Sequence, residues 1–178
     1  MTLPRSRRAP LSGSKPVVVE MQTFLPFPSF EKSAACLDNR RLGKQRVEAM
    51  QILNVLAGRR SGWKHHPAVL MWQGYEKALR QYLRAVILEW KRRGFQNSIP
   101  IPRKELLLPH EMPPWMGSRR FHASHRSNLL RKDAEHYGKL GWKVRPDLPC
   151  HWPVRKGTTL GRSQAVTWVT GDEQRMKR

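Results

Sequence analysis

The chain has 178 residues, with 34 Lys or Arg against 13 Asp or Glu, which gives a formal net charge of +21. No apolar run approaches the roughly 18 residues of a membrane-spanning helix, and two distant cysteines form neither a disulfide framework nor a CxxC zinc finger. In a compact fold these positive charges repel one another, and binding to a polyanion reduces the repulsion. The composition therefore indicates a nucleic-acid partner. Without a secretory signal we expect a cytoplasmic, nucleoid-associated monomer with no membrane partner.

Both ends of the chain have the composition of basic tails. Residues 1–20 place four cations among Pro, Ser and Gly, and residues 154–178 combine glycines with polar residues and a closing Arg-Met-Lys-Arg run. Such segments bury too little apolar surface to order themselves, so we expect one domain over residues 21–153. Residues 1–20 are a DNA-contacting arm, an organelle-targeting segment, or the result of a translation start assigned upstream of a true start at Met21. The sequence leaves these three options open.

The first half of the domain contains two helix signals in succession. Ser29 is placed to cap a short helix that runs to about Leu37. Asp38 is a favourable N-cap for the next helix, which should run through about Ala57 and end at Gly58. Apolar residues recur there at helical spacing.

Two further helices are predicted in the second half. The clearest starts at Pro67, a favoured first helical position, and should continue to Gly94. Residues 98–117 hold five prolines and predict a loop, after which a last helix spans about 119–132 with a second piece to Tyr137. No stretch alternates as a strand would, so we predict an all-α domain of three main helices.

The polar face of the helix after Asp38 is the first candidate for chemistry. Arg41, Lys44, Gln45 and Glu48 lie three or four residues apart and should share one stripe. The stripe is either a solvated face on which Lys44 pairs with Glu48, or a pocket for an anionic substrate. In the second case Arg41 and Arg46 would hold phosphates, and Asp38 or Glu48 would carry protons.

Histidines form the second candidate. His65 and His66 precede Pro67 at a helix N-terminus, where free N–H groups favour anions. His122 and His125 lie one turn apart and are either ordinary surface or capping residues or, with Asp38 or Cys150, metal ligands. No third ligand has convincing spacing, so we predict no metal and no cofactor.

Aromatic residues near expected loops are the third candidate, because exposed rings among arginines stack on unpaired bases. These residues are Trp63, Trp115, Tyr137, Trp142 and Trp152. Core filling is the commoner use of tryptophan, and we expect at least three of the seven in the core.

Several motifs together resemble a known family. They are HPAVLMWQGYEKALR at 66–80, EWKRRGF at 89–95 and FHASHRSNLLRKDAEHYG at 121–138. Over roughly residues 21–142 the chain resembles the pyrimidine-dimer DNA glycosylases of the bacteriophage endonuclease V type. It is more similar still to a bacterial branch with MQTFLP, LDxxRLGKQR and WxHHP motifs, which match at residues 21–26, 37–46 and 63–67.

The resemblance implies a compact helical enzyme of base-excision repair that removes damaged pyrimidines and nicks the abasic site. In the family an N-terminal α-amine attacks the sugar C1′ and forms a Schiff base, and an acid on the first long helix assists. That acid falls at Asp38 or Asn39 here, and only Asp38 can serve. Arg41 matches an arginine of the catalytic helix.

We therefore expect a damaged-DNA glycosylase and abasic-site lyase that acts on double-stranded DNA. The expected catalytic residues are Asp38, Arg41, Lys44, Glu48, His65 and His66. The expected DNA contacts are Arg40, Arg46, His122, His125, Arg126, Arg131 and Lys132. The alternatives are a non-catalytic DNA-binding protein of the same fold, a metal-dependent nuclease or hydrolase that uses His65, His66, His122 and Asp38, and an RNA-binding protein.

Overall fold

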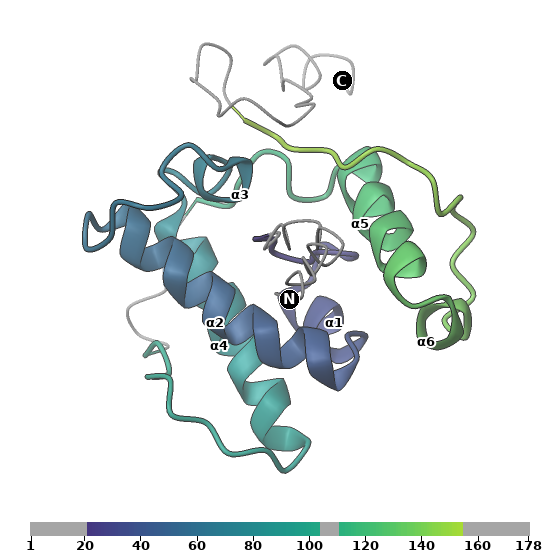
Figure 1. Cartoon of the computed structure of the whole chain (residues 1–178), viewed down its shortest axis with the longest axis horizontal. Coiled ribbons are helices and arrows are strands. Elements are labelled where there is room, and N and C mark those ends of the chain that lie inside the picture. The colour runs from purple at the N-terminus through teal and green to yellow at the C-terminus, as the bar shows by residue number, and fades with distance from the viewer. Residues whose placement is uncertain (1–20, 104–110, 155–178) are drawn as a thin grey trace, which may run out of the picture.

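The computed structural model describes residues 21–103 and 111–154, and the secondary structure of these ranges is helical (Figure 1). The helices are α1 (Phe30–Ala35), α2 (Asn39–Leu56), α3 (Pro67–Leu70), α4 (Glu76–Arg92), α5 (Arg119–Lys132) and α6 (Ala134–Gly138). The all-α fold with three main helices, α2, α4 and α5, is confirmed. The expected tails lie outside the described residues, apart from Val154, which is buried. None of the described helices is both long and apolar enough to cross a membrane.

Local signals set the helix ends as the sequence predicted. The side chain of Ser29 accepts a hydrogen bond from the backbone N–H of Lys32 at the start of α1. The carboxylate of Asp38 does the same for Arg41 at the start of α2. After α2 the chain turns at Gly58 with a φ of +72°, a backbone conformation that glycine adopts without strain.

The prediction of one continuous helix from Pro67 to Gly94 is wrong. The structure divides it into α3 and α4, with a turn between them in which Gly74 has a φ of +85°. A residue with that φ cannot continue a right-handed helix. The apolar spacing persists through the turn because Trp72 is fully buried and Tyr75 packs against the core, so the hydrophobic period conceals the break.

The core lies where α2 and α1 pack against α4. Gly43 of α2 brings this helix close to Trp90 of α4, since a Cβ added at Gly43 would lie 3.1 Å from ring atoms of Trp90. Tryptophans fill much of the remaining core: Trp72, Trp115 and Trp152 are buried. The expectation that at least three of the seven tryptophans serve the core is confirmed.

An extended segment, residues 21–25, runs through the interior between α2 and α5 (Figure 1). Its residues are all buried. On the α2 side, Gln45 accepts a hydrogen bond from the N–H of Phe24 at 2.9 Å and donates one to the carbonyl oxygen of Gln22 at 2.8 Å. One buried glutamine thus replaces the neighbouring strand that an extended chain would need for its backbone groups.

On the α5 side, two histidines complete the support of this segment. His125 accepts a hydrogen bond from the N–H of Leu25 at its Nδ1, at 3.2 Å. The Nδ1 of His122 lies 2.7 Å from the carbonyl oxygen of Leu25, while its Nε2 accepts from the N–H of Gly117. His122 therefore carries its proton on Nδ1 and donates it to Leu25. Residues 21–25 are held from both sides by side chains.

Candidate active site

The polar stripe of α2 is buried in part: Lys44 is exposed, whereas two of its other members are not. Gln45 is fully buried and Glu48 is 4% exposed, because the segment 21–25 covers them. Val47, an apolar residue of the same helix, is by contrast 39% exposed. Lys44 does pair with Glu48 as the sequence suggested, but the partner of this half-exposed lysine is a buried carboxyl group.

Glu48 lies among a small number of polar neighbours. Its Oε2 accepts a hydrogen bond of 2.6 Å from Nε2 of Gln45, and its Oε1 lies 3.3 Å from Nζ of Lys44. Oε1 is fully buried, so the half-exposed Lys44 reaches it from the surface of the protein. The carboxyl group therefore has the Gln45 amide, the Lys44 amine and the backbone N–H of Gln22 in place of the water that it gave up.

This environment changes the acidity of Glu48. Burial raises its pKa from 4.5 to about 7, and the charge of Lys44 together with hydrogen bonds from Lys44, Gln45 and the backbone N–H of Gln22 acts in the opposite direction. A carboxyl group with a pKa near 7 is protonated in part of the molecules at neutral pH, so it can either donate or accept a proton. Strongly shifted groups of this kind are concentrated at functional sites.

Asp38, ten residues earlier at the start of α2, has a different environment. Its carboxylate accepts hydrogen bonds from the N–H of Arg41 at 3.0 Å, from the guanidinium of Arg41 at 2.6 Å and from the hydroxyl of Tyr137 at 2.5 Å. Although burial acts to raise it, the hydrogen bonds from Tyr137 and Arg41 hold the pKa of Asp38 below its usual value. Asp38 is therefore ionised at neutral pH.

Arg41 is engaged in the same cluster. Besides Asp38, its guanidinium lies 3.5 Å from Asp133 and 5.4 Å from the centre of the Tyr137 ring. The hydroxyl of Tyr137 also accepts a hydrogen bond from the N–H of Asp38 at 3.2 Å. These contacts tie the start of α2 to α6 and use the side chains that the sequence assigned to catalysis.

The two other arginines of α2 differ in exposure. Arg40 is exposed. Arg46 lies over the ring of Trp90 at 4.2 Å and donates a hydrogen bond of 2.7 Å to Asn97. Stacking on a ring and bonding to an amide hold the guanidinium against the protein, whereas Arg40 is accessible to a phosphate.

The histidines fall into different surroundings. His65 is exposed, whereas His66 caps α3 by accepting the N–H of Ala68 at 3.1 Å. His122 and His125 are buried against the segment 21–25 and do not reach the surface. Burial lowers the pKa of His122, and burial together with neighbouring positive charge lowers that of His125 to about 3. Both are therefore neutral at physiological pH and serve the core.

The cations of α5 also differ from one another. Arg126 is partly buried and donates a hydrogen bond of 2.6 Å to the carbonyl oxygen of Pro26. Arg131 and Lys132 are exposed, and Arg131 contacts the carbonyl oxygen of Leu148 at 3.1 Å. Among residues 21–103 and 111–154, no group of three or more His, Cys, Asp or Glu is placed to hold a metal ion.

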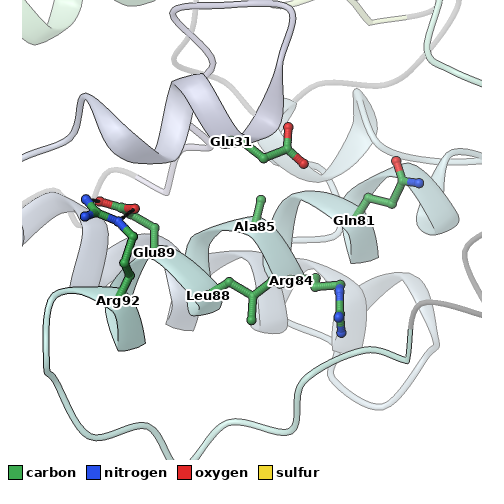
Figure 2. Close-up of a pocket in the computed structure, with 7 residues that line it drawn as sticks. All are labelled: Glu31, Gln81, Arg84, Ala85, Leu88, Glu89 and Arg92. Atoms are coloured by element: carbon green, nitrogen blue, oxygen red, sulfur yellow. Dashed lines mark hydrogen bonds and ion pairs between the residues drawn. The ribbon is translucent and has the colours of Figure 1, made fainter.

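A cavity of about 320 Å³ lies beside α4, away from Glu48. Figure 2 shows Glu31 of α1 above it and the other side chains on α4. The lining residues are Glu31, Gln81, Arg84, Ala85, Leu88, Glu89 and Arg92. Arg92 and Glu89 are paired there at 2.7 Å. None of the residues predicted for catalysis or DNA contact lines this cavity.

Sequence patterns missed the residues that define the environment of Glu48. Gln22 and Gln45 meet across 23 positions of the chain, and Asn128 of α5 donates a hydrogen bond of 3.0 Å to the side chain of Gln22. Helical spacing relates residues within one helix only, so it could not show this contact. The one available signal was the presence of two polar residues, Gln45 and Glu48, between apolar positions of α2.

A helical, strongly basic chain that holds one buried acid of raised pKa beside a lysine is suited to proton transfer on an anionic substrate. Compared with known families, residues 21–102 match the family model described as pyrimidine dimer DNA glycosylase. The resemblance drawn from the motifs is thereby confirmed over this segment, and it indicates DNA repair of the glycosylase type with damaged DNA as the partner. No curated protein and no solved structure matches the chain.

Proposed function

We propose that the protein is a DNA glycosylase with abasic-site lyase activity, in which Glu48 transfers the protons. The observation that supports this most is the carboxyl group of Glu48, which is buried, has a pKa of about 7 and lies 3.3 Å from the amine of Lys44. It lies inside the segment that matches pyrimidine dimer DNA glycosylases.

The proposed reaction joins an amine to the sugar. The amine nitrogen forms a bond to C1′ while the bond between C1′ and the base breaks, and the base leaves with that electron pair and receives a proton. The amine then loses a proton, the sugar ring opens, and a Schiff base forms. Removal of a proton from C2′ by a base expels the 3′-phosphate and nicks the strand. Glu48 donates in the first step and accepts in the last.

Two amines fit this role, that of Lys44 and that of a chain terminus. Lys44 has its Nζ at 3.3 Å, and its side chain is 52% exposed. The family resemblance favours a chain terminus instead. In a form that starts at Met21, that terminus would lie next to Gln22, whose backbone N–H bonds to Glu48. Because an α-amine has a pKa of about 7.7–8.0, more of it is unprotonated at neutral pH than of a typical lysine.

Asp38 has a structural role in this proposal. Its carboxylate accepts three hydrogen bonds and has a lowered pKa, so it holds no proton to donate near neutrality. With Arg41 and Tyr137 it fixes the start of α2 and thereby the position of Glu48 further along the same helix. His65 is exposed and His66 caps α3, so neither is needed for proton transfer.

The phosphate contacts in this proposal come from exposed cations. Arg40 on α2 and Arg131 and Lys132 at the end of α5 are accessible to DNA. Arg126 and Arg46 are held by contacts within the protein and contribute less. Each phosphate contact that is lost should make the negative slope of log K against log salt shallower by about 0.9.

Borohydride trapping on a duplex with one abasic site tests the proposal. The full chain, a form that starts at Met21, and the Glu48→Gln and Lys44→Ala variants are compared, and the linked residue is mapped by mass spectrometry. An adduct at Lys44 or at the terminus that Glu48→Gln abolishes supports the proposal. Absence of an adduct from both the full chain and the form that starts at Met21, with DNA binding intact, contradicts it.

A non-catalytic DNA-binding protein of the same fold is the second candidate. It is favoured by the burial of Glu48, whose side chain is only 6% exposed, because a substrate atom reaches this carboxyl only when the cover over it moves. Tight, salt-sensitive binding to duplex DNA without strand cleavage would identify this function.

A further inference from the structure

The loop of residues 58–66, called here the Trp63 loop, joins α2 to α3 and has no role in the site described above. Trp63 is 46% exposed, in contrast to the buried Trp72, Trp115 and Trp152. An exposed tryptophan gives up the apolar burial that this side chain usually supplies. Core packing therefore does not account for this residue.

The backbone of the loop holds Trp63 in an unusual conformation. Its φ is +70°, and within residues 21–103 and 111–154 it is the one non-glycine residue with a positive φ. Such a conformation costs free energy for a bulky residue and persists where the surrounding contacts fix it. The N–H of His66 bonds to the carbonyl oxygen of Trp63 at 2.9 Å, and the N–H of Arg59 bonds to that of Asn54 at 2.9 Å.

Two further aromatic rings connect the indole of Trp63 to the core. The ring of Trp63 meets His66 edge to face with 5.2 Å between centroids, and His66 meets Trp152 in the same way at 5.9 Å. His66 is fixed by its capping bond to α3, and Trp152 is 4% exposed. The exposed indole is therefore attached to the core and loses little freedom when it binds a ligand.

The charge around Trp63 has one sign. Arg59, Arg60 and Lys64 are exposed, as is His65, and the sequence contains no Asp or Glu between Glu48 and Glu76. An exposed aromatic ring among cations is the arrangement that binds unpaired nucleic-acid bases: the cations attract the backbone, and the ring stacks on a base. A protein partner would have to place acidic residues around an apolar pocket that fits the indole. An unpaired base meets a simpler requirement, because every base has a flat face on which a ring can stack.

We propose that Trp63 stacks on an unpaired base of DNA, while the cations of its loop hold the adjoining phosphates. This inference rests on the proposed function, which supplies DNA as the partner. From Glu48 to the end of α2 at Leu56 the helix rises about 12 Å, at 1.5 Å per residue, which corresponds to between three and four base steps of about 3.4 Å. This separation is shorter than one turn of a duplex, so DNA bound over the middle of α2 extends to the Trp63 loop.

Binding to matched duplexes tests the proposal. Fluorescence anisotropy measures the affinity of the full chain for a fully paired duplex and for the same duplex with a single-base bulge, at one salt concentration. Trp63→Ala should weaken binding to the bulged duplex about tenfold and leave the paired duplex within twofold, because one stacking contact is lost. Trp63→Phe should keep most of the preference.

Two further variants separate base stacking from a loss of stability and from a general loss of apolar surface. Trp63→Gly removes the ring but adopts a positive φ without strain, so it should lose the preference without loss of stability. Leu88→Ala removes an apolar side chain of similar exposure, 45%, from α4 and should change neither affinity. Equal weakening on both duplexes, or no weakening, would overturn the role of Trp63, and equally tight binding to a bulged RNA duplex would overturn DNA as the partner.

These experiments distinguish a failure of the stacking proposal from a failure of the proposed lyase function. If the wild-type chain prefers the bulged duplex through Trp63 but gives no borohydride adduct, the stacking role stands and the lyase chemistry fails. If an adduct forms but Trp63→Ala keeps the preference, the lyase chemistry stands and the stacking role fails. If the chain binds no DNA, both fail.

Discussion

Asp38 and Glu48 lie on the same helix, at its start and near its middle, and their acidities move in opposite directions. Both carboxyl groups lose water, which acts to raise the pKa of each. Asp38 accepts bonds from a guanidinium, a hydroxyl and a backbone N–H, and its side chain is 15% exposed. Glu48 is stabilised by the Gln45 amide, the Lys44 amine and the backbone N–H of Gln22, but its side chain is only 6% exposed. The hydrogen bonds of Asp38 outweigh its partial burial, whereas the deeper burial of Glu48 outweighs the groups that stabilise its ionised form.

This difference separates a structural acid from one that can exchange protons. A carboxylate with three donors stabilises a fixed geometry, and its lowered pKa keeps it charged. A more deeply buried carboxyl group whose pKa is about 7 changes its protonation near neutral pH. The predictions below test whether the two acids of α2 differ in this way.

The largest expected effect is the loss of cleavage in Glu48→Gln. The amide keeps the size of the side chain but cannot carry the proton, so cleavage of an abasic-site duplex should fall by about 10²–10⁴-fold. Single-turnover kinetics measure the rate, and anisotropy measures the affinity, which should stay within twofold. Asp38→Asn is the matched control and should retain most of the rate, and loss of cleavage in this control instead would make Asp38 the catalytic acid.

The second effect concerns stability and pH. The pKa of Glu48 is about 7 in the folded chain against 4.5 unfolded, so the folded state binds the proton more tightly. Its contribution to stability is complete below pH 4.5 and is lost as the pH rises through 7, by roughly 3 kcal/mol at most. Urea unfolding of the wild type and Glu48→Gln at pH 5 and pH 8 measures this. The variant should gain relative stability at pH 8, and equal differences at both values would show that the pKa is not raised.

A smaller loss is expected for Asp38→Ala. The substitution removes the N-cap of α2 and leaves Arg41 and the Tyr137 hydroxyl without their acceptor. It should lower the free energy of unfolding by about 2 kcal/mol. Urea titration at neutral pH is the measurement. Asp38→Asn retains a capping oxygen and should lose less, and a loss as large as that of the alanine variant would argue against the capping role.

Tyr137→Phe should have the smallest effect. It removes only the hydroxyl that donates to Asp38, while the ring remains beside Arg41. A loss of about 1 kcal/mol in unfolding free energy is expected, with the cleavage rate unchanged. A large fall in rate with normal stability would place Tyr137 in the chemistry.

The accuracy of the sequence prediction varied with the range of the interactions involved. Ser29, Asp38 and Gly58 mark helix ends through contacts within one turn, and each was predicted. The break at Gly74 was missed because buried residues on both sides preserved the helical period.

The environment of the candidate site was harder to predict, for a related reason. Glu48 and Lys44 were both candidates, and their spacing left a solvated face and a pocket for an anionic substrate as open alternatives. The choice between these depends on residues 21–25, which reach Gln45 from more than twenty positions away. No pattern within α2 contains that contact.

The amide of Leu25 has an acceptor of a rare kind, the imidazole nitrogen of His125. The carbonyl acceptors of a β-sheet keep their lone pairs at any ordinary acidity, but an imidazole loses its free lone pair when it is protonated. Because the pKa of His125 is about 3, this happens only in strong acid. The exchange rate of that single amide with solvent deuterium should therefore rise once the pH falls below about 3, while amides bonded to helix carbonyls remain protected. One hydrogen atom would thus report when the interior of the protein begins to open.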